Sequence, residues 1–158
     1  MNTITSIRQI LLRDIDRLRV EIEAFEHEAD LWRAVPGTTN PPGALALHLC
    51  GNLQHFIGAT LGSTGYVRDR DAEFAARDVP RASVLAEIAT ARSVVERALG
   101  ELDEAEVARE YPARFLDELP TTGAVLMHLS GHLMYHLGQI NYARRFHAAP
   151  APSPRFVT

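Results

Sequence analysis

The first 32 residues of the chain carry apolar side chains at the spacing of an α-helix. These residues follow one another mainly at intervals of three or four: Ile7, Ile10, Leu11, Ile15, Leu18, Ile22 and Phe25. Such a period gathers them on one face of a helix, predicted from about Thr3 to Trp32. No alternating strand pattern appears elsewhere in the sequence. The apolar face is therefore predicted to be buried against other helices.

Three later segments support the same fold class. A second helix is predicted over about 41–61, with Asn40 as its cap and prolines in its first turn. A third is predicted over about 81–99, and a fourth over about 121–146 with Thr121 as its cap. The sequence therefore predicts an all-α fold, a four-helix bundle.

The predicted connections differ greatly in length. About five residues join the first two helices, whereas segments 62–80 and 100–120 are each near twenty residues, a length often associated with function. The charges of segment 65–74, GYVRDRDAEF, alternate between aromatic residues, which favours a salt-bridged surface loop over a substrate clamp. One domain is predicted over 1–147, followed by a proline-rich, extended tail over 148–158.

Composition excludes several classes of function. The chain has 158 residues, 46% of them hydrophobic, which is enough for one core. A net charge of −4 gives no excess of positive charge that would attract nucleic acid or an anionic membrane. All sixteen basic residues are arginine, which excludes a Schiff-base lysine. With a lone Cys50 and no N-terminal targeting pattern, a soluble cytoplasmic protein is expected.

Three histidines recur every four residues in the stretch HLSGHLMYHLGQI. On a helix, His132 and His136 lie about 40° apart in the middle of the apolar face, while His128 lies at its edge. His48 of the second helix has a similar inward position. Two imidazoles at this spacing reach one metal ion, but inward histidines are also common as neutral, hydrogen-bonded core residues. Spacing alone leaves both interpretations open.

An internal similarity relates the second and fourth helices. Segment 43–58 aligns with 123–138 without a gap and with seven identical pairs, one of which equates His48 with His128. This predicts two related helices. Each segment also has two glycines seven residues apart, which predicts a close helix approach at these positions: Gly51 and Gly58, Gly131 and Gly138.

Across nearly its whole length the chain resembles the DinB-like family of bacterial four-helix-bundle proteins. The resemblance is carried by LALHLCGNLQHFIG, GYVRDRDAEF and HLMYHLGQINYARR in this order, and most specifically by His48, His132, His136, Gly138 and Gln139. It implies that the three histidines bind a divalent metal ion, most often zinc or nickel, with coordination positions left open to water or substrate. It also implies a long crossover between helices two and three, and a homodimer.

The chain departs from the family pattern at two positions. Many relatives have an acidic residue directly after the first histidine of the late pair and another histidine just before the second, where this chain has Leu133 and Tyr135. The three-histidine set is unaffected, but a nearby carboxylate is missing. None of the twenty acidic residues falls in the predicted second or fourth helix. A general base would therefore have to come from elsewhere, such as metal-bound hydroxide itself.

Two classes of function remain open. The resemblance implies a metal-dependent enzyme, a thiol-dependent transferase or a hydrolase, acting on a small molecule, with a low-molecular-weight thiol as a cosubstrate. The alternative is a non-catalytic metal- or small-ligand-binding bundle with a structural or sensory site. Four residues are candidates for orienting the ligands or contacting the substrate: Asn52, His128, Tyr135 and Gln139. His128 is also the reserve metal ligand, because it is the counterpart of His48 in the internal similarity.

The fourth helix is predicted to be apolar around most of its circumference. Away from the histidines, another side of it carries Met127, Gly131, Met134, Gly138 and Tyr142. A helix with so narrow a polar sector lies either at the centre of a bundle or against a partner. Together with the family resemblance, this predicts a homodimer formed through helix faces.

Overall fold

The computed structural model describes residues 2–116 and 120–148. Its four longest helices are α1 (Thr3–Glu23), α2 (Pro42–Leu53), α4 (Arg81–Gly100) and α6 (Thr122–His147). A π-helical segment, η2 (Gln54–Ala59), continues α2. An isolated β-bridge joins Glu110 and Thr121, and no strand is formed within the described residues. The prediction of an all-α fold is confirmed.

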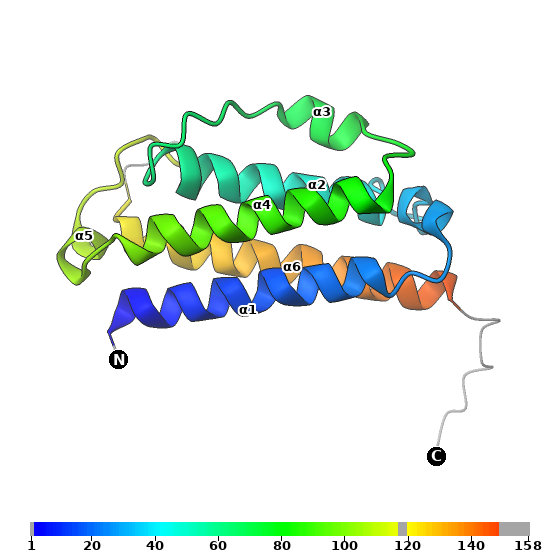
Figure 1. Ribbon diagram of the computed structural model, residues 1–158, viewed down its shortest axis with the longest axis horizontal. Coiled ribbons are helices and arrows are strands. Elements are labelled where there is room, and N and C mark those ends of the chain that lie inside the picture. The colour runs from blue at the N-terminus through cyan, green and yellow to red at the C-terminus, as the bar shows by residue number, and fades with distance from the viewer. Residues whose placement is uncertain (1, 117–119, 149–158) are drawn as a thin grey trace, which may run out of the picture.

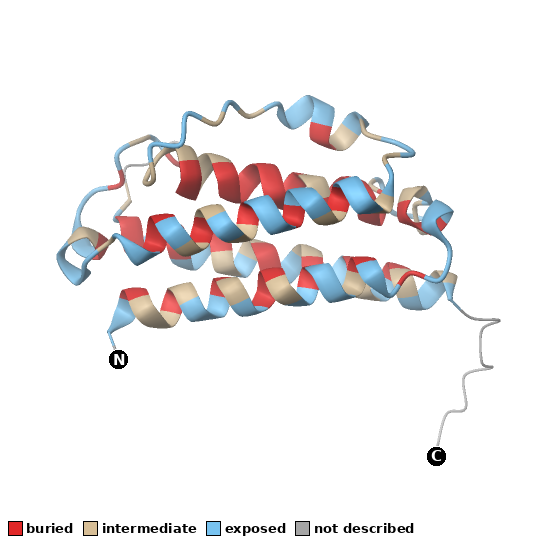
Figure 2. Ribbon diagram, viewed as in Figure 1, coloured by how far each residue is buried: buried red, intermediate tan, exposed pale blue. Residues whose placement is uncertain are grey.

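The four long helices surround a common core. Both α1 and α2 pack against α4 and α6, so that α1 and α2 occupy opposite corners of the bundle. Figure 1 shows the connection from η2 to α4 returning along the bundle above α2, and α2 and α4 starting at the same end. This returning connection contains the short helix α3 (Arg70–Ala75), which packs on α2. As a result, α2 is covered on both sides and is buried along nearly its whole length (Figure 2).

The periodic apolar residues of α1 form one side of the core. All but one of those singled out in the sequence are buried, and only Ile10 is exposed, at 39%. The two shorter helical segments lie in the connections: η1 (Glu28–Trp32), a 3-10 helix before α2, and α5 (Glu104–Ala108), before α6. No helix within the described ranges combines the length and apolar character needed to cross a bilayer.

The first helix is shorter than its apolar period predicts. It ends at Glu23, and residues 24–41 connect it to α2, far more than the five expected. Phe25 and Leu31 are buried all the same, because this irregular segment folds back onto the core. Here the Trp32 indole donates a hydrogen bond to the Val79 carbonyl, at 3.1 Å, which ties the segment to the returning connection. The apolar period therefore continued past the end of the helix itself.

The predicted helix starts are confirmed at two positions and wrong at one. Helix α4 follows Pro80, and the Thr121 hydroxyl accepts a hydrogen bond from the Ala124 amide, as expected of a cap. At α2, however, the cap position is Pro41 and not Asn40, and no side chain accepts a hydrogen bond from the first turn. Residues 149–158 of the predicted tail lie outside the described residues.

The four glycines that recur after seven residues in the two similar segments have two different environments. A side chain at Gly51 would clash with the Glu73 carboxylate of α3, and a Cβ at Gly58 would lie 2.5 Å from the Val94 side chain. By contrast, a Cβ at Gly131 or Gly138 would meet nothing within 4 Å. The predicted close approach is therefore confirmed for α2 and wrong for α6, where both glycines lie on the exposed side.

This difference predicts opposite effects of the same substitution on stability. Gly131→Ala is expected to raise the free energy of unfolding by about 0.5–1 kcal/mol, because alanine favours an open helical position. Gly51→Ala is expected to lower it, because the new methyl group displaces the buried Glu73 carboxylate. Urea unfolding of the two variants measures both effects. A destabilised Gly131→Ala would mean that this position has no room for a methyl group.

Candidate metal centre

Three histidine side chains from two helices meet between α2 and α6. His48 of α2, His132 and His136 of α6 each offer one ring nitrogen, and these nitrogens lie within 4.8 Å of one another. His48 is buried, and the two histidines of α6 are partly buried. The structure thus brings together the three histidines on which the sequence analysis centred, and together they could hold a divalent metal ion.

The spacing of the closest pair suits a shared ion. Nε2 of His48 and Nε2 of His132 are 3.2 Å apart. Two nitrogens that each bind one ion at about 2.0–2.1 Å lie about 2.8–3.4 Å from each other, for coordination angles between octahedral and tetrahedral. The same distance also allows one ring to donate a hydrogen bond to the other. The presence of the third ring, His136, beside this pair favours a shared ion over a simple hydrogen bond between two rings.

The two histidines of α6 are in the protonation state that a metal ion requires. Burial, assisted by the neighbouring histidines, lowers the pKa of His132 to about 4. Burial also lowers the pKa of His136, although the hydrogen bond with Gln139 opposes the shift. Both rings are therefore neutral at physiological pH, and a neutral imidazole has a nitrogen lone pair available for a cation.

Outer hydrogen bonds orient two of the three rings. Nδ1 of His48 lies 3.0 Å from Oε2 of Glu73, and Nδ1 of His136 lies 2.6 Å from Oε1 of Gln139. Each oxygen accepts the Nδ1 proton, which leaves Nε2 free to face the cluster. Nδ1 of His132 is buried without a hydrogen-bond partner among the described residues. His132 thus lacks the outer contact that orients the other two rings.

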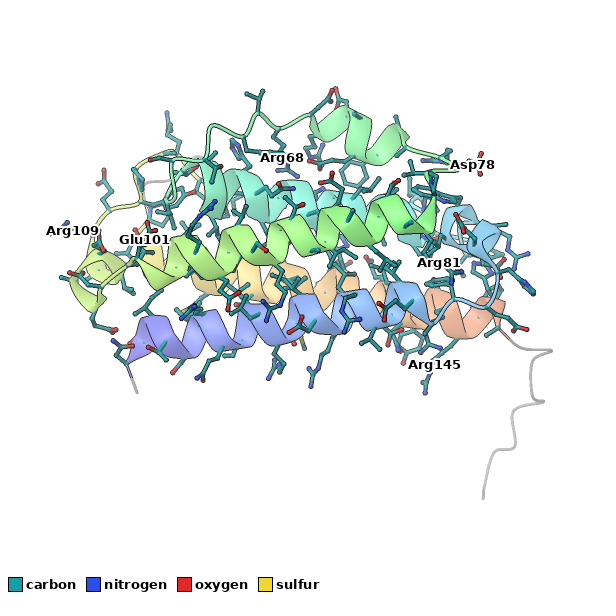
Figure 3. All side chains as sticks on the ribbon, in the orientation of Figure 1. Arg68, Asp78, Arg81, Glu101, Arg109 and Arg145 are labelled. Carbon is teal, nitrogen blue, oxygen red and sulfur yellow. The ribbon has the colours of Figure 1, made fainter. Side chains whose placement is uncertain are left out.

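Glu73 and Arg68 complete the surroundings of His48. Arg68 donates two hydrogen bonds of 2.8 Å to the Glu73 carboxylate, and its Nη2 also lies 3.1 Å from Nδ1 of His48. Burial raises the pKa of Glu73, but the hydrogen bonds from His48 and Arg68 outweigh this effect, and the net shift is downward. Glu73 is therefore a carboxylate at neutral pH. Figure 3 labels Arg68 on the segment that returns above α2.

Neither residue could be singled out from the sequence. The prediction of a salt-bridged surface loop over 65–74 is right for the Arg68–Glu73 ion pair but wrong for the place of Glu73, whose side chain is only 7% exposed. A carboxylate is thus present beside the histidines, although it comes from α3 and not from the position of Leu133. Gly51 could have indicated a buried neighbour on α2, because a residue without a side chain leaves room for a group such as the Glu73 carboxylate.

The other candidate residues lie around the three histidines. His128 is exposed, and its ring stacks on His132 with the centroids 6.5 Å apart. The exposed Tyr135 ring meets His136 edge-on at 5.1 Å. Asn52 is buried, and its Oδ1 has no hydrogen-bond partner among the described residues. His128, the reserve ligand, is not part of the three-histidine group.

The lone thiol of the chain is not available for chemistry at this site. Cys50 is buried in α2, and burial raises its pKa far above the usual range for a thiol. Because the thiolate is the reactive form of cysteine, Cys50 is an inert core residue at physiological pH.

The lowered pKa of His132 predicts acid sensitivity of the metal-free protein. Between the ordinary value of 6.5 and about 4, the unfolded chain binds a proton at this residue and the folded protein does not. The free energy of unfolding is therefore expected to fall as the pH drops through this window, by about 1–2 kcal/mol for a partly exposed, solvent-screened ring. Urea unfolding at several pH values measures the slope. An equal slope in His132→Gln would contradict this assignment.

Comparison with known proteins adds one finding to this geometry. The family profile of the DinB superfamily matches residues 10–140, a range that includes all three histidines and Glu73. No curated protein gives a significant match to the chain.

Proposed function

The chain belongs to the DinB superfamily, and on this premise we propose that it binds one divalent metal ion through His48, His132 and His136. The observation that carries the proposal is the convergence of three ring nitrogens within 4.8 Å of one another. The supporting chemistry is a set of nitrogen donors whose two α6 members are neutral at physiological pH. Imidazole ligands suit zinc and nickel among other ions, and we propose that one of these two is bound here.

We further propose that the protein is a metal-dependent enzyme acting on a small molecule, of the thiol-dependent transferase or hydrolase type. A bound divalent ion supplies Lewis-acid chemistry, and catalytic sites typically use three protein ligands with a position left open. The chain's own residues orient the site, with Glu73 holding the ring of His48 and Gln139 that of His136. Because Cys50 is buried and protonated, a thiol would have to come from a small-molecule cosubstrate.

One observation favours a non-catalytic binding bundle as the second candidate. Glu73 is the carboxylate that contacts the histidines, and its oxygens are already bonded to His48 and Arg68. A carboxylate held in this way orients a ligand but has little freedom to act as a general base. A structural or sensory metal site needs no such base.

Metal analysis followed by activity screening tests the two candidates. The protein is loaded with zinc or nickel, its metal content is measured, and it is assayed with low-molecular-weight thiols and electrophiles, and separately with esters and amides. We expect one ion per chain, and turnover that disappears in the metal-free protein. Stoichiometric metal without turnover supports the binding bundle. Failure to bind either ion would contradict both candidates.

We also propose a homodimer formed through the outer side of α6. Met127 is 65% exposed and Met134 is 44% exposed, with Gly131 between them leaving the surface flat. Exposed apolar side chains grouped on one helix face are typical of a surface that binds another protein. Light scattering at micromolar concentration is expected to give twice the chain mass for the wild type and the chain mass for Met127→Glu. A monomeric wild type would contradict this proposal.

A further inference from the structure

A groove of about 710 Å³ lies beside the candidate metal centre, between the loop that precedes α2 and one side of α6. Its walls are mainly apolar side chains from this loop, from the first turn of α2 and from α6: Val35, Pro42, Leu45, Tyr142, Ala143 and Phe146. The volume falls in the range of small-molecule sites, which is about 300–1,000 Å³. The groove therefore has the size and the lining of a ligand site.

The groove adjoins the three-histidine group at one residue, His136. His136 belongs to both, and Gln139, which is bonded to Nδ1 of His136 at 2.6 Å, also lines the groove. Tyr135 lines it too and meets the His136 ring edge-on. A molecule lying in the groove would thus have one end at His136 and the remainder along α6 toward Phe146.

The lining also restricts the chemistry of such a molecule. None of the described residues that line the groove is an aspartate, glutamate or arginine, and the polar ones, such as Thr38, Asn40 and Gln139, are neutral. A charged group in the body of the ligand would lose its hydration without gaining a partner. Tyr142 is 77% exposed and Phe146 57% exposed, so both rings have apolar surface to cover. The body of the ligand is therefore neutral and apolar.

We propose that this groove binds the aliphatic or aromatic body of a small molecule whose anionic oxygen or sulfur head group reaches the ion held at His136. This inference rests on the proposed metal site and adds to it the class of ligand. The head group is attracted by the ion, and the body is selected by the apolar side chains along α6.

A series of alkyl hydroxamates tests the inference, because the head group stays constant while the body grows. Calorimetry measures their affinities for the zinc-loaded protein, from acetohydroxamate to octanohydroxamate. A fully buried methylene gives roughly a fourfold gain, and about half of that effect, about twofold, is expected in a groove open to solvent. Over six methylenes the affinity is then expected to rise roughly 60-fold.

Two glycines of α6 provide a matched pair of variants. A Cβ at Gly138 or at Gly131 meets nothing within 4 Å, but of the two only Gly138 lines the groove. Gly138→Trp is expected to fill the groove and reduce the affinity for octanohydroxamate to that for acetohydroxamate. Gly131→Trp adds the same side chain outside the groove and is expected to keep the chain-length dependence. Both variants are made in the Met127→Glu chain, so that the proposed dimer face does not affect the comparison.

The possible failures are distinguishable. Absence of stoichiometric zinc would overturn the metal site and this inference together, whereas acetohydroxamate binding without any gain along the series would overturn the groove alone. A second copy of the chain would be the occupant if the Met127→Glu chain stayed dimeric and adding Gly138→Trp made it monomeric. The C-terminal segment would be the occupant if Phe156→Asp raised the affinity for octanohydroxamate. Either result would also overturn the proposal.

Discussion

Replacing His132 with alanine is expected to abolish stoichiometric metal binding. Its Nε2 lies 3.2 Å from that of His48, and its ring lies between those of His128 and His136 on α6. Removing a residue that only orients a ligand weakens metal binding about 10–100-fold, and removing a ligand itself has a larger effect. The metal content after loading and dialysis, measured by mass spectrometry, is expected to fall from about one ion per chain to near zero.

The matching controls are two other histidines of the chain. His128→Ala removes a ring that stacks on His132 but lies outside the three-histidine group, and it is expected to leave the metal content unchanged. His55 lies in η2, which continues the helix that carries His48, and His55→Ala is also expected to leave the metal content unchanged. If His128→Ala lost the ion while His132→Ala kept it, the ligand would be His128 and not His132. The internal similarity, which pairs His128 with His48, would then have indicated the correct residue.

The inward positions of His132, His136 and His48 could be predicted from local periodicity, but it was the family resemblance that singled out these three as one metal-binding set. A spacing of four residues fixes the relative direction of His132 and His136 on any helix, and the surrounding apolar residues indicate which side of the helix is buried. His48 required one further assumption, that the second helix packs beside the fourth. The bundle satisfies it, since α2 and α6 are in contact.

Glu73 could not be predicted in this way because its position depends on the path of a long connection. Its sequence neighbours are mostly charged, and nothing in their order tells which carboxylate turns inward. The decisive facts are tertiary: the connection returns above α2, α3 packs on that helix, and Gly51 leaves room for the carboxylate. Side chains placed by a returning connection are therefore the part of this site that sequence patterns do not reach.

The internal similarity was informative about helix type and misleading about environment. Segments 43–58 and 123–138 both form helices, but α2 is covered by α3, whereas the corresponding side of α6 is exposed. Consequently Gly51 is a tight contact and its counterpart Gly131 is open. For the same reason His48 is buried while its counterpart His128 is exposed. Two similar helices of one bundle need not have similar surroundings.

Replacing Glu73 with glutamine is expected to weaken metal binding about 10–100-fold while the fold is kept. The carboxylate accepts the Nδ1 proton of His48 at 3.0 Å and is held in turn by Arg68. Glutamine has the same shape, and its amide oxygen still accepts a hydrogen bond. It cannot provide the negative charge, however, which makes the imidazole a better electron donor and neutralises Arg68. The dissociation constant is measured by competition with a chromophoric chelator.

Glu87→Gln is the matched control for this measurement. Glu87 accepts a hydrogen bond from Gln54 at 3.4 Å and belongs to α4, so the substitution removes the same charge from the same side-chain shape away from His48. It is expected to leave the dissociation constant within about twofold. If Glu73→Gln bound zinc as tightly as the wild type, the carboxylate would serve only to fasten α3 onto α2. In that case Glu73→Gln would lower the free energy of unfolding without changing the dissociation constant of the ion. Measuring both quantities therefore separates a residue that positions the ligand from one that only stabilises the fold.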